Sequence, residues 1–177
     1  MQEHGLKISE LVTLFNLEVL NRGSDYDTAL LTITDVNRPG LQFHSFYDYF
    51  DPRRLQVLGK AEITYLKGLT TEQRRKCFDD LFLYDIPALV ISRGLDCFPE
   101  CLESARVHER TLLRTEETTV EFTSHTIEYL NRVLAPCVTR HGVLLDISGE
   151  GVMITGDSGI GKSESAIELI MRGHRLG

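Results

Sequence analysis

The chain has 177 residues, of which 42% are hydrophobic and 8% aromatic, so it can bury a core and does not have the composition of a disordered polymer. Acidic residues outnumber lysine and arginine by 26 to 19, and the formal net charge of −7 argues against a nucleic-acid surface. No stretch approaches the roughly 20 apolar residues that cross a bilayer, and no apolar signal segment follows the polar first residues. We therefore expect a cytoplasmic protein that binds neither nucleic acid nor membrane.

The first part of the chain predicts alternating helices and strands. Apolar periodicity and cap residues predict helices over 8–15, 60–67, 71–84, 99–107 and 118–134, and strands over 17–20, 29–36, 55–58, 88–91 and 111–113. The aromatic stretch 41–50 has no clear assignment. Strand and helix alternate three times between residues 55 and 134, which is typical of an α/β fold with a mostly parallel sheet.

A short basic run, Arg74, Arg75 and Lys76, lies on the helix predicted over 71–84. We interpret it as a solvated helix face rather than a binding patch, because charged runs on amphipathic helices usually face water.

The four cysteines are Cys77, Cys97, Cys101 and Cys137, and only Cys97 and Cys101 are close in sequence. Zinc sites usually combine two or more close Cys/His pairs. We expect reduced, partly buried thiols, with neither a metal nor a disulfide.

Pro136 ends the last helix of this first part, and we place a domain boundary near residues 135–139. The prediction is an α/β amino-terminal domain over residues 1–134, followed by the beginning of a second domain over 135–177.

The second domain opens with a predicted strand over 140–147, a turn over 148–151 and a strand over 152–155. A helix is predicted over 162–171, with Gly173 at its C-terminal cap. The residues between the second strand and this helix satisfy the P-loop pattern G-x-x-x-x-G-K-S, and they are Gly156, Asp157, Ser158, Gly159, Ile160, Gly161, Lys162 and Ser163. The pattern thus follows a strand and opens a helix, as a P-loop requires.

Each part of this pattern has a physical role in binding a nucleotide triphosphate or pyrophosphate. The glycines let backbone N–H groups converge on phosphate oxygens, and the helix N-terminus adds a favourable dipole. Lys162 can reach the outer phosphates as a point charge, and the Ser163 hydroxyl can ligate Mg²⁺.

The position of His141 follows from the predicted hairpin. If Gly149 and Glu150 form a two-residue turn, Leu144 faces Thr155 and His141 faces Ser158, although the register could slip by one or two residues. A titratable imidazole then lies at the mouth of the nucleotide site, where it could sense or handle phosphate charge. A polar histidine at a strand end with no role is the alternative.

At these residues the chain resembles the HPr kinase/phosphorylase family of bacteria. The matching segments are 141–147 (HGVLLDI), 151–164 (GVMITGDSGIGKSE), 172–176 (RGHRL), 38–41 (RPGL), Phe43 with 47–50 (YDYF), and 92–95 (SRGL). The similarity covers nearly the whole chain and is more specific than the P-loop alone.

The resemblance implies a P-loop kinase domain that uses Mg²⁺ with ATP or pyrophosphate to phosphorylate a serine of the phosphocarrier protein HPr. It also implies the reverse reaction, in which phosphate removes the seryl phosphate and releases pyrophosphate, and a homohexamer in carbon catabolite control. The resemblance puts Lys162 and His141 at active-site positions and Ser163 at the Mg²⁺ ligand. The amino-terminal domain then has a structural or regulatory role.

The resemblance also implies an aspartate pair, one of them the general base, and a glutamate metal ligand after the 172–176 segment. These lie beyond Gly177, so we expect the chain alone to be inactive. Two other functions remain possible for such a P-loop: a kinase of small molecules, and a regulatory module that binds nucleotide without turnover.

Overall fold

The computed structural model describes residues 5–136 and 140–176. The chain divides into two compact units, Met1–Ala135 and Pro136–Gly177, called unit 1 and unit 2 below. The boundary predicted near 135–139 falls partly on residues 137–139, which lie outside the described residues. Cys137 is one of these three.

Unit 1 is built around a five-stranded sheet in the order β2-β7-β6-β5-β4. Its strands are β2 (Glu18–Asn21), β4 (Val36–Asn37), β5 (Leu55–Leu58), β6 (Leu89–Ile91) and β7 (Leu112–Arg114). The strands from β4 to β7 are mutually parallel, and β2 pairs with β7 in the antiparallel sense. A separate antiparallel pair is formed by β1 (Leu6–Lys7) and β3 (Leu30–Leu31). The predicted α/β fold with a mostly parallel sheet is confirmed.

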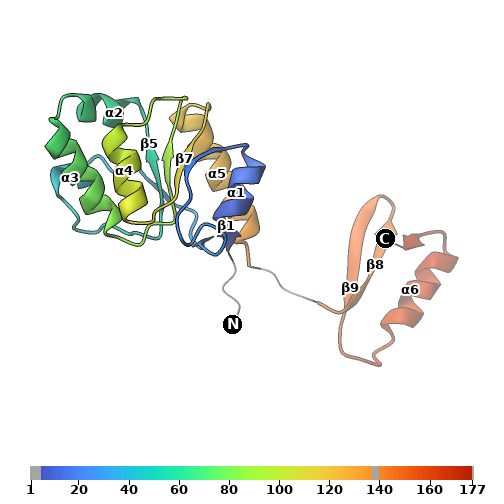
Figure 1. The fold of residues 1–177 in the computed structure, drawn as a ribbon. Coiled ribbons are helices and arrows are strands. Elements are labelled where there is room, and N and C mark those ends of the chain that lie inside the picture. The colour runs from blue at the N-terminus through green and yellow to red at the C-terminus, as the bar shows by residue number, and fades with distance from the viewer. Residues whose placement is uncertain (1–4, 137–139, 177) are drawn as a thin grey trace. The chain divides into compact units, whose positions relative to one another are not determined.

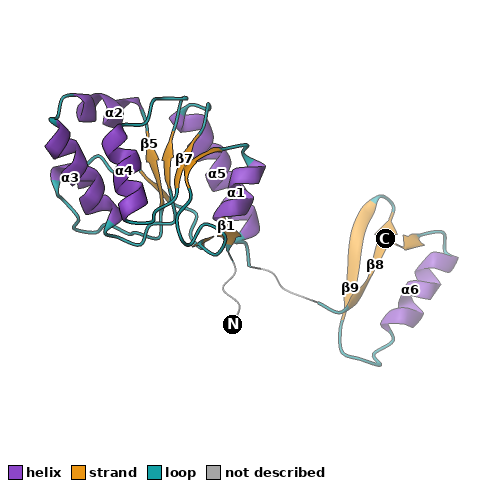
Figure 2. Ribbon diagram, in the orientation of Figure 1, coloured by secondary structure: helices purple, strands orange, loops and turns teal. Residues whose placement is uncertain are grey.

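Helices cover both faces of this sheet, as Figures 1 and 2 show. One face carries α2 (Lys60–Lys67), α3 (Thr71–Phe82) and α4 (Pro99–Val107), and the other carries α1 (Ile8–Leu14) and α5 (Thr119–Val133). A 3₁₀ turn, η1 (Gln42–His44), precedes β5 in the stretch that had no predicted assignment.

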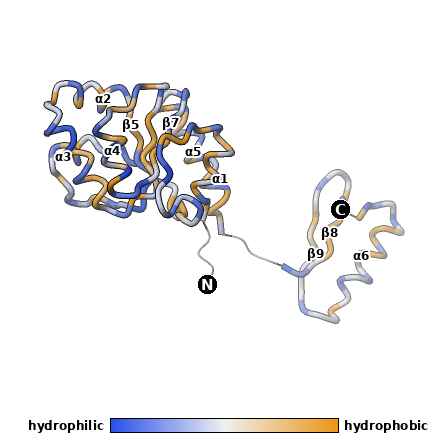
Figure 3. The backbone as a smooth tube through the Cα atoms, viewed as in Figure 1, coloured by the Kyte–Doolittle hydropathy of each residue, from blue (hydrophilic) through white to orange (hydrophobic). Residues whose placement is uncertain are grey.

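The sequence of β6 explains this sandwich. Successive side chains of a strand point to opposite faces, and Leu89 and Ile91 join the core cluster under α2, α3 and α4, whereas Val90 joins the cluster under α1 and α5. All three are at most 1% exposed. The continuous apolar run therefore reflects burial on both faces, as in parallel sheets generally. Figure 3 shows the central strands as hydrophobic segments between more polar helices.

Capping residues set the starts of two helices. Thr70 caps α3 by accepting a hydrogen bond from the Gln73 N–H, and Thr118 caps α5 by accepting one from the Glu121 N–H, each within a full capping box. The helix predicted from residue 118 therefore begins one residue later.

One strand prediction for unit 1 is wrong. The strand predicted over 29–36 is two short strands in different sheets, because the chain bends at residues 33–34 between β3 and β4. On α5, Phe122 and Leu130 lie on the buried face, whereas Val120, two residues before Phe122 and so about 200° around the helix from it, is 73% exposed.

Unit 2 contains β8 (Gly142–Ile147), β9 (Glu150–Thr155), α6 (Lys162–Met171) and β10 (Arg175–Leu176). The strands form an antiparallel sheet in the order β10-β8-β9. The hairpin, loop and helix follow the predicted order, while β10 was not predicted. None of the described helices is long and apolar enough to cross a membrane.

Candidate functional site

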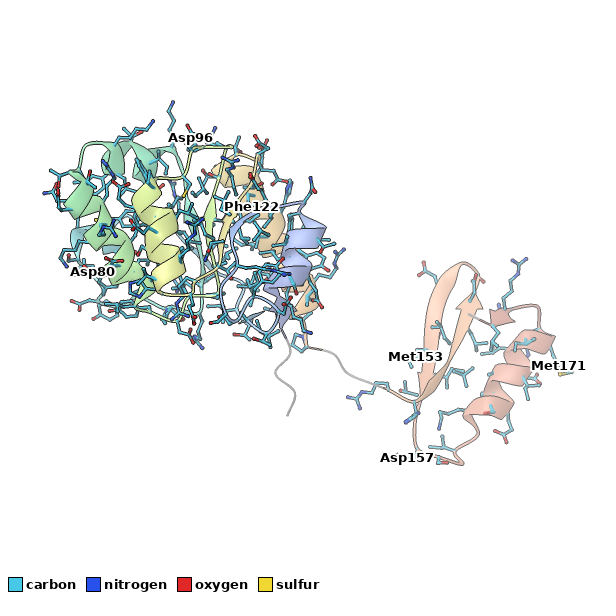
Figure 4. The ribbon with its side chains drawn as sticks, viewed as in Figure 1. Asp80, Asp96, Phe122, Met153, Asp157 and Met171 are labelled. Carbon is cyan, nitrogen blue, oxygen red and sulfur yellow. The ribbon has the colours of Figure 1, made fainter. Side chains whose placement is uncertain are left out.

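The P-loop pattern occupies the connection between β9 and α6. Figure 4 places Asp157 at the turn between the strand and the helix, at the end of the strand that carries Met153. The helix begins at Lys162, so its first N–H groups, which have no partner within the helix, face this loop. The local arrangement is strand, glycine-rich loop and helix, as the pattern requires.

Gly161 permits the sharp entry into α6. It is the N-cap residue and has φ 95° and ψ 18°, a left-handed conformation that costs an L-residue with a side chain about 1–2 kcal/mol. Its glycine character therefore lets the chain turn directly from the loop into the helix.

Lys162 lies folded over its own loop. Its Nζ donates hydrogen bonds to the carbonyl oxygens of Gly156 at 2.9 Å and Asp157 at 2.6 Å. The ammonium group is thus held at the loop that precedes α6, where phosphate oxygens could take the place of the two carbonyl oxygens.

Ser163 is the second residue of α6 and is exposed. A hydroxyl at this position lies in the first turn of the helix, next to Lys162. The structure therefore brings the whole predicted loop, residues 156–163, together in one segment, in which residues 156–160 and Ser163 are exposed and Gly161 and Lys162 are half-buried.

The predicted hairpin register is wrong by two residues. Leu144 pairs with Met153 rather than Thr155, and Ile147 pairs with Glu150, so the turn residues are Ser148 and Gly149. Both have positive φ, 59° and 88°, as a type I′ turn requires, and the Gly149 N–H donates to Asp146 Oδ1 at 2.8 Å.

His141 is therefore not opposite Ser158. It lies exposed directly before β8, and one further step in the observed register places it opposite Gly156, the first residue of the loop. The shift thus moves the residue opposite His141 from the middle of the loop, Ser158, to its start, Gly156.

A pocket in unit 2, away from the P-loop, was not predicted. A cavity of about 370 Å³ is lined by the hairpin turn and the segment after α6, namely Asp146, Ser148, Gly149, Gly173, His174 and Arg175. The pairing of β10 with β8 brings these segments together, and no pattern in residues 172–176 predicted it.

The thiols and acidic groups of the described ranges form no metal centre. Cys77, Cys97 and Cys101 are free, and no group of three or more His, Cys, Asp or Glu side chains in the described residues could hold a metal. The loop in unit 2 thus offers backbone amides, the ammonium group of Lys162 and the hydroxyls of Ser158 and Ser163, and His141 lies directly before β8.

These features define an α/β unit followed by a P-loop unit whose entry strand comes through an antiparallel hairpin. Comparison with protein families identifies it further: residues 6–130 match the model described as HPr Serine kinase N terminus, and residues 132–176 match HPr Serine kinase C-terminal domain. The chain belongs to the HPr serine kinase family.

Curated relatives named HPr kinase/phosphorylase share almost half of the residues. The protein of Alkaliphilus metalliredigens is 47% identical over 171 residues, which covers 97% of this chain and 55% of the relative. The protein of Clostridium beijerinckii is 46% identical over 172 residues, covering 97% and 56%. The chain thus spans about half the length of the curated relatives it matches.

One solved structure resembles the fold at low sequence identity. It contains the CBS and DRTGG domains of the regulatory region of a Clostridium perfringens pyrophosphatase, complexed with the activator diadenosine tetraphosphate. The TM-score is 0.52 with 12% identity, and the match covers 94% of this chain and 60% of that one. At this identity the likeness concerns the fold alone.

Proposed function

We propose that this chain is the amino-terminal domain and the phosphoryl-donor-binding segment of a protein-serine kinase/phosphorylase that acts on the phosphocarrier protein HPr. The observation that carries the proposal is Lys162, held over a P-loop at the start of α6. The names of the curated relatives support HPr as the protein substrate.

The donor in this proposal is ATP or pyrophosphate. The N–H groups at the start of α6 and in the loop 156–161 point their positive ends at the phosphate oxygens. Lys162 exchanges its two carbonyl partners for phosphate oxygens, and such charge-assisted bonds are the stronger ones.

Magnesium fits the residues present at Ser163. Mg²⁺ is usually held by one or two protein oxygens, with waters and substrate phosphates completing its shell, and Ser163 presents one exposed hydroxyl in the first turn of α6. When bound, the ion neutralises charge on the donor phosphates.

His141 is proposed to act beside the first residue of the loop. An imidazole there changes charge near neutral pH and can respond to the phosphate charge held by Gly156 and its neighbours.

The proposed reaction is in-line transfer. The serine oxygen of HPr attacks the terminal phosphoryl group, while the loop amides and Lys162 hold the donor in line and stabilise its charge. In the reverse direction phosphate attacks the seryl phosphate and pyrophosphate forms. The proton acceptor that the family resemblance implies is not among residues 1–177, so we propose that this chain alone binds the donor without turnover.

The wider role proposed is carbon catabolite control in the cytoplasm by a homohexamer. This part rests on membership of the family alone.

Binding of the donor is tested by calorimetry of the chain with Mg-ATP and with Mg-pyrophosphate. Replacing Lys162 with alanine should raise the Kd at least about tenfold, because hydrogen bonds to a charged group contribute about 1.5–3 kcal/mol. Lys60 offers a matched control, since it is an exposed lysine at the first position of α2 and also follows a glycine N-cap. Lys60→Ala should leave the Kd unchanged, and equal affinities for wild type and Lys162→Ala would sink the proposal.

The substrate is tested in a chimera in which residues 1–176 replace the aligned part of the Alkaliphilus metalliredigens relative. With HPr and Mg-ATP the folded chimera should form phosphoserine, and its Lys162→Ala variant should not. Phosphorylation of nucleosides in place of HPr would instead identify a small-molecule kinase. Donor binding with no acceptor phosphorylated would identify a non-catalytic module.

A further inference from the structure

Cys97 and Cys101 lie together at the start of α4 in unit 1. Cys97 directly precedes the N-cap residue Phe98, and Cys101 is the third residue of the helix. Cys101 is completely buried in the core cluster beneath α2, α3 and α4, and Cys97 is half-buried and packs against the same cluster. The Cys97 side chain is therefore partly exposed, and Cys101, four residues later in α4, is buried in the core that Cys97 packs against.

The surroundings of the two sulfur atoms shift the thiol pKa in opposite directions. A hydrogen bond from the Cys101 thiol lowers the pKa of Cys97 despite partial burial, and the Leu102 N–H and the charge of Arg114 act in the same direction. Burial raises the pKa of Cys101, and its bond to Cys97 raises it further. As a neutral thiol Cys97 donates weakly to the Phe98 carbonyl oxygen at 3.4 Å. The pKa of the outer thiol, Cys97, is thus lowered, and that of the inner thiol, Cys101, is raised.

Cys77 is an internal reference for an unreactive thiol. It is 8% exposed, it donates to the Phe43 carbonyl oxygen at 3.4 Å, and burial raises its pKa. Because the thiolate is the nucleophile, the structure ranks Cys97 above Cys77 in reactivity.

We propose that Cys97 is an oxidation site for hydroperoxides and that Cys101 resolves the product to an intramolecular disulfide. The Cys97 thiolate attacks one oxygen of hydrogen peroxide, an S–O bond forms, the O–O bond breaks, and hydroxide leaves and is protonated to water. The Cys101 sulfur then attacks the Cys97 sulfur, the S–O bond breaks, and the hydroxyl leaves as water with the Cys101 proton. Two thiols lose two electrons in total, and one peroxide is reduced to two waters.

The disulfide would join the loop after β6 to the first turn of α4. That turn also carries Glu100, whose carboxylate accepts hydrogen bonds from Arg74 on α3 at 2.9 and 3.3 Å. Oxidation would therefore act where the loop after β6, the start of α4 and the Arg74 side chain of α3 meet. The proposal does not depend on the P-loop in unit 2.

The test is peptide mapping after treatment of the reduced, folded chain with hydrogen peroxide. Trypsin releases both cysteines in one peptide, 94–106, and a disulfide lowers its mass by two hydrogen atoms. Cleavage after Glu100 should then leave the two halves joined until a reductant is added. We expect Cys97 to be lost from alkylation about tenfold faster than Cys77.

Single variants separate the two roles. In Cys101→Ala a sulfenic acid should persist at Cys97 and react with dimedone, whereas in Cys97→Ala the remaining thiols should resist the same peroxide dose. Cys77→Ser should behave as wild type, and Cys137→Ser excludes a linkage through that residue. The proposal is overturned if peptide 94–106 keeps both thiols in the folded chain, or if Cys77 is oxidised as fast as Cys97.

Discussion

Units 1 and 2 differ in how their apolar side chains are covered. In unit 1 two clusters fill both faces of the sheet, and residues such as Phe78 and Phe122 are completely buried. In unit 2 only Leu145 and Ala166 are buried among the described residues, whereas Ile160, Ile167, Met171 and Leu176 are 57–78% exposed.

This difference indicates that different interactions stabilise the folded state of the two units. Unit 1 has a tertiary core that contributes most of its stability, as in ordinary domains. Unit 2 is held by the β8–β9 ladder, the hairpin turn and the hydrogen bonds of Lys162. The candidate site lies on this second, locally stabilised unit, and binding sites are commonly drawn from such regions.

The largest expected effect on stability comes from a substitution in the core of unit 1. Phe122 is 0% exposed and its ring makes an edge-to-face contact with Phe15 at 5.9 Å, so Phe122→Ala should lower the free energy of unfolding by about 3–5 kcal/mol. All six tyrosines lie in unit 1, so urea titration followed by tyrosine fluorescence reports this unit alone.

Its matched control is Val120→Ala, two residues away on α5 and 73% exposed, which should change the same value by less than about 0.5 kcal/mol. In unit 2, Ile167→Ala should likewise cause only a small change in the hydrogen-exchange protection of the α6 amides. A large loss there would mean that unit 2 has a core of its own.

A middle-sized effect concerns the ion pair of Arg74 and Glu100. Both side chains are largely buried, and Arg74→Met should cost about 3 kcal/mol because it leaves the carboxylate without its partner. Burial raises the pKa of Glu100, but the hydrogen bonds and charge of Arg74, together with hydrogen bonds from the helix backbone and Thr71, outweigh burial and the pKa is lowered.

The pH dependence of this pair follows from that direction. A carboxyl with a lowered pKa adds stability above its unfolded pKa of about 4.3 and loses it as the pH falls through the folded value. The difference in unfolding free energy between wild type and Glu100→Gln should therefore be full at neutral pH and shrink at more acidic pH. A difference that grows on acidification would refute the assignment.

The smallest effect tests the local forces in unit 2. Gly149 has φ 88° in the hairpin turn with open space around it, so Gly149→Ala should cost about 1 kcal/mol through backbone strain alone. Gly151 also has no neighbour within 4 Å but has no positive φ, so Gly151→Ala should cause no loss. Hydrogen exchange of the β8 and β9 amides measures both, and equal responses would show that turn geometry does not hold the hairpin.

Much of unit 1 could be predicted because its signals are local. The apolar run 88–91 required burial on both faces, and Thr70 and Thr118 marked helix starts through their own side chains. The strand predicted over 29–36 was wrong because the alternation of apolar and polar residues does not reveal a bend between two strands.

Interactions between distant residues were beyond the sequence patterns. Arg74, expected on a solvated face, is largely buried because Glu100, 26 residues later, accepts its hydrogen bonds. In unit 2 the loop could be read from its glycines and lysine, but the register depended on the backbone conformation of Ser148, a residue with little intrinsic preference for positive φ. The role of each residue in the loop stays a prediction.

The two edge strands of the five-stranded sheet in unit 1 determine how easily a strand of another chain could pair with it. At one edge β4 is only two residues long, and at the other β2 has an irregularity in its pairing between Val19 and Asn21. Short and irregular edges offer few free backbone groups in register, so a second chain has little to pair with. Both edges of the five-stranded sheet thus disfavour the addition of a strand from a second chain.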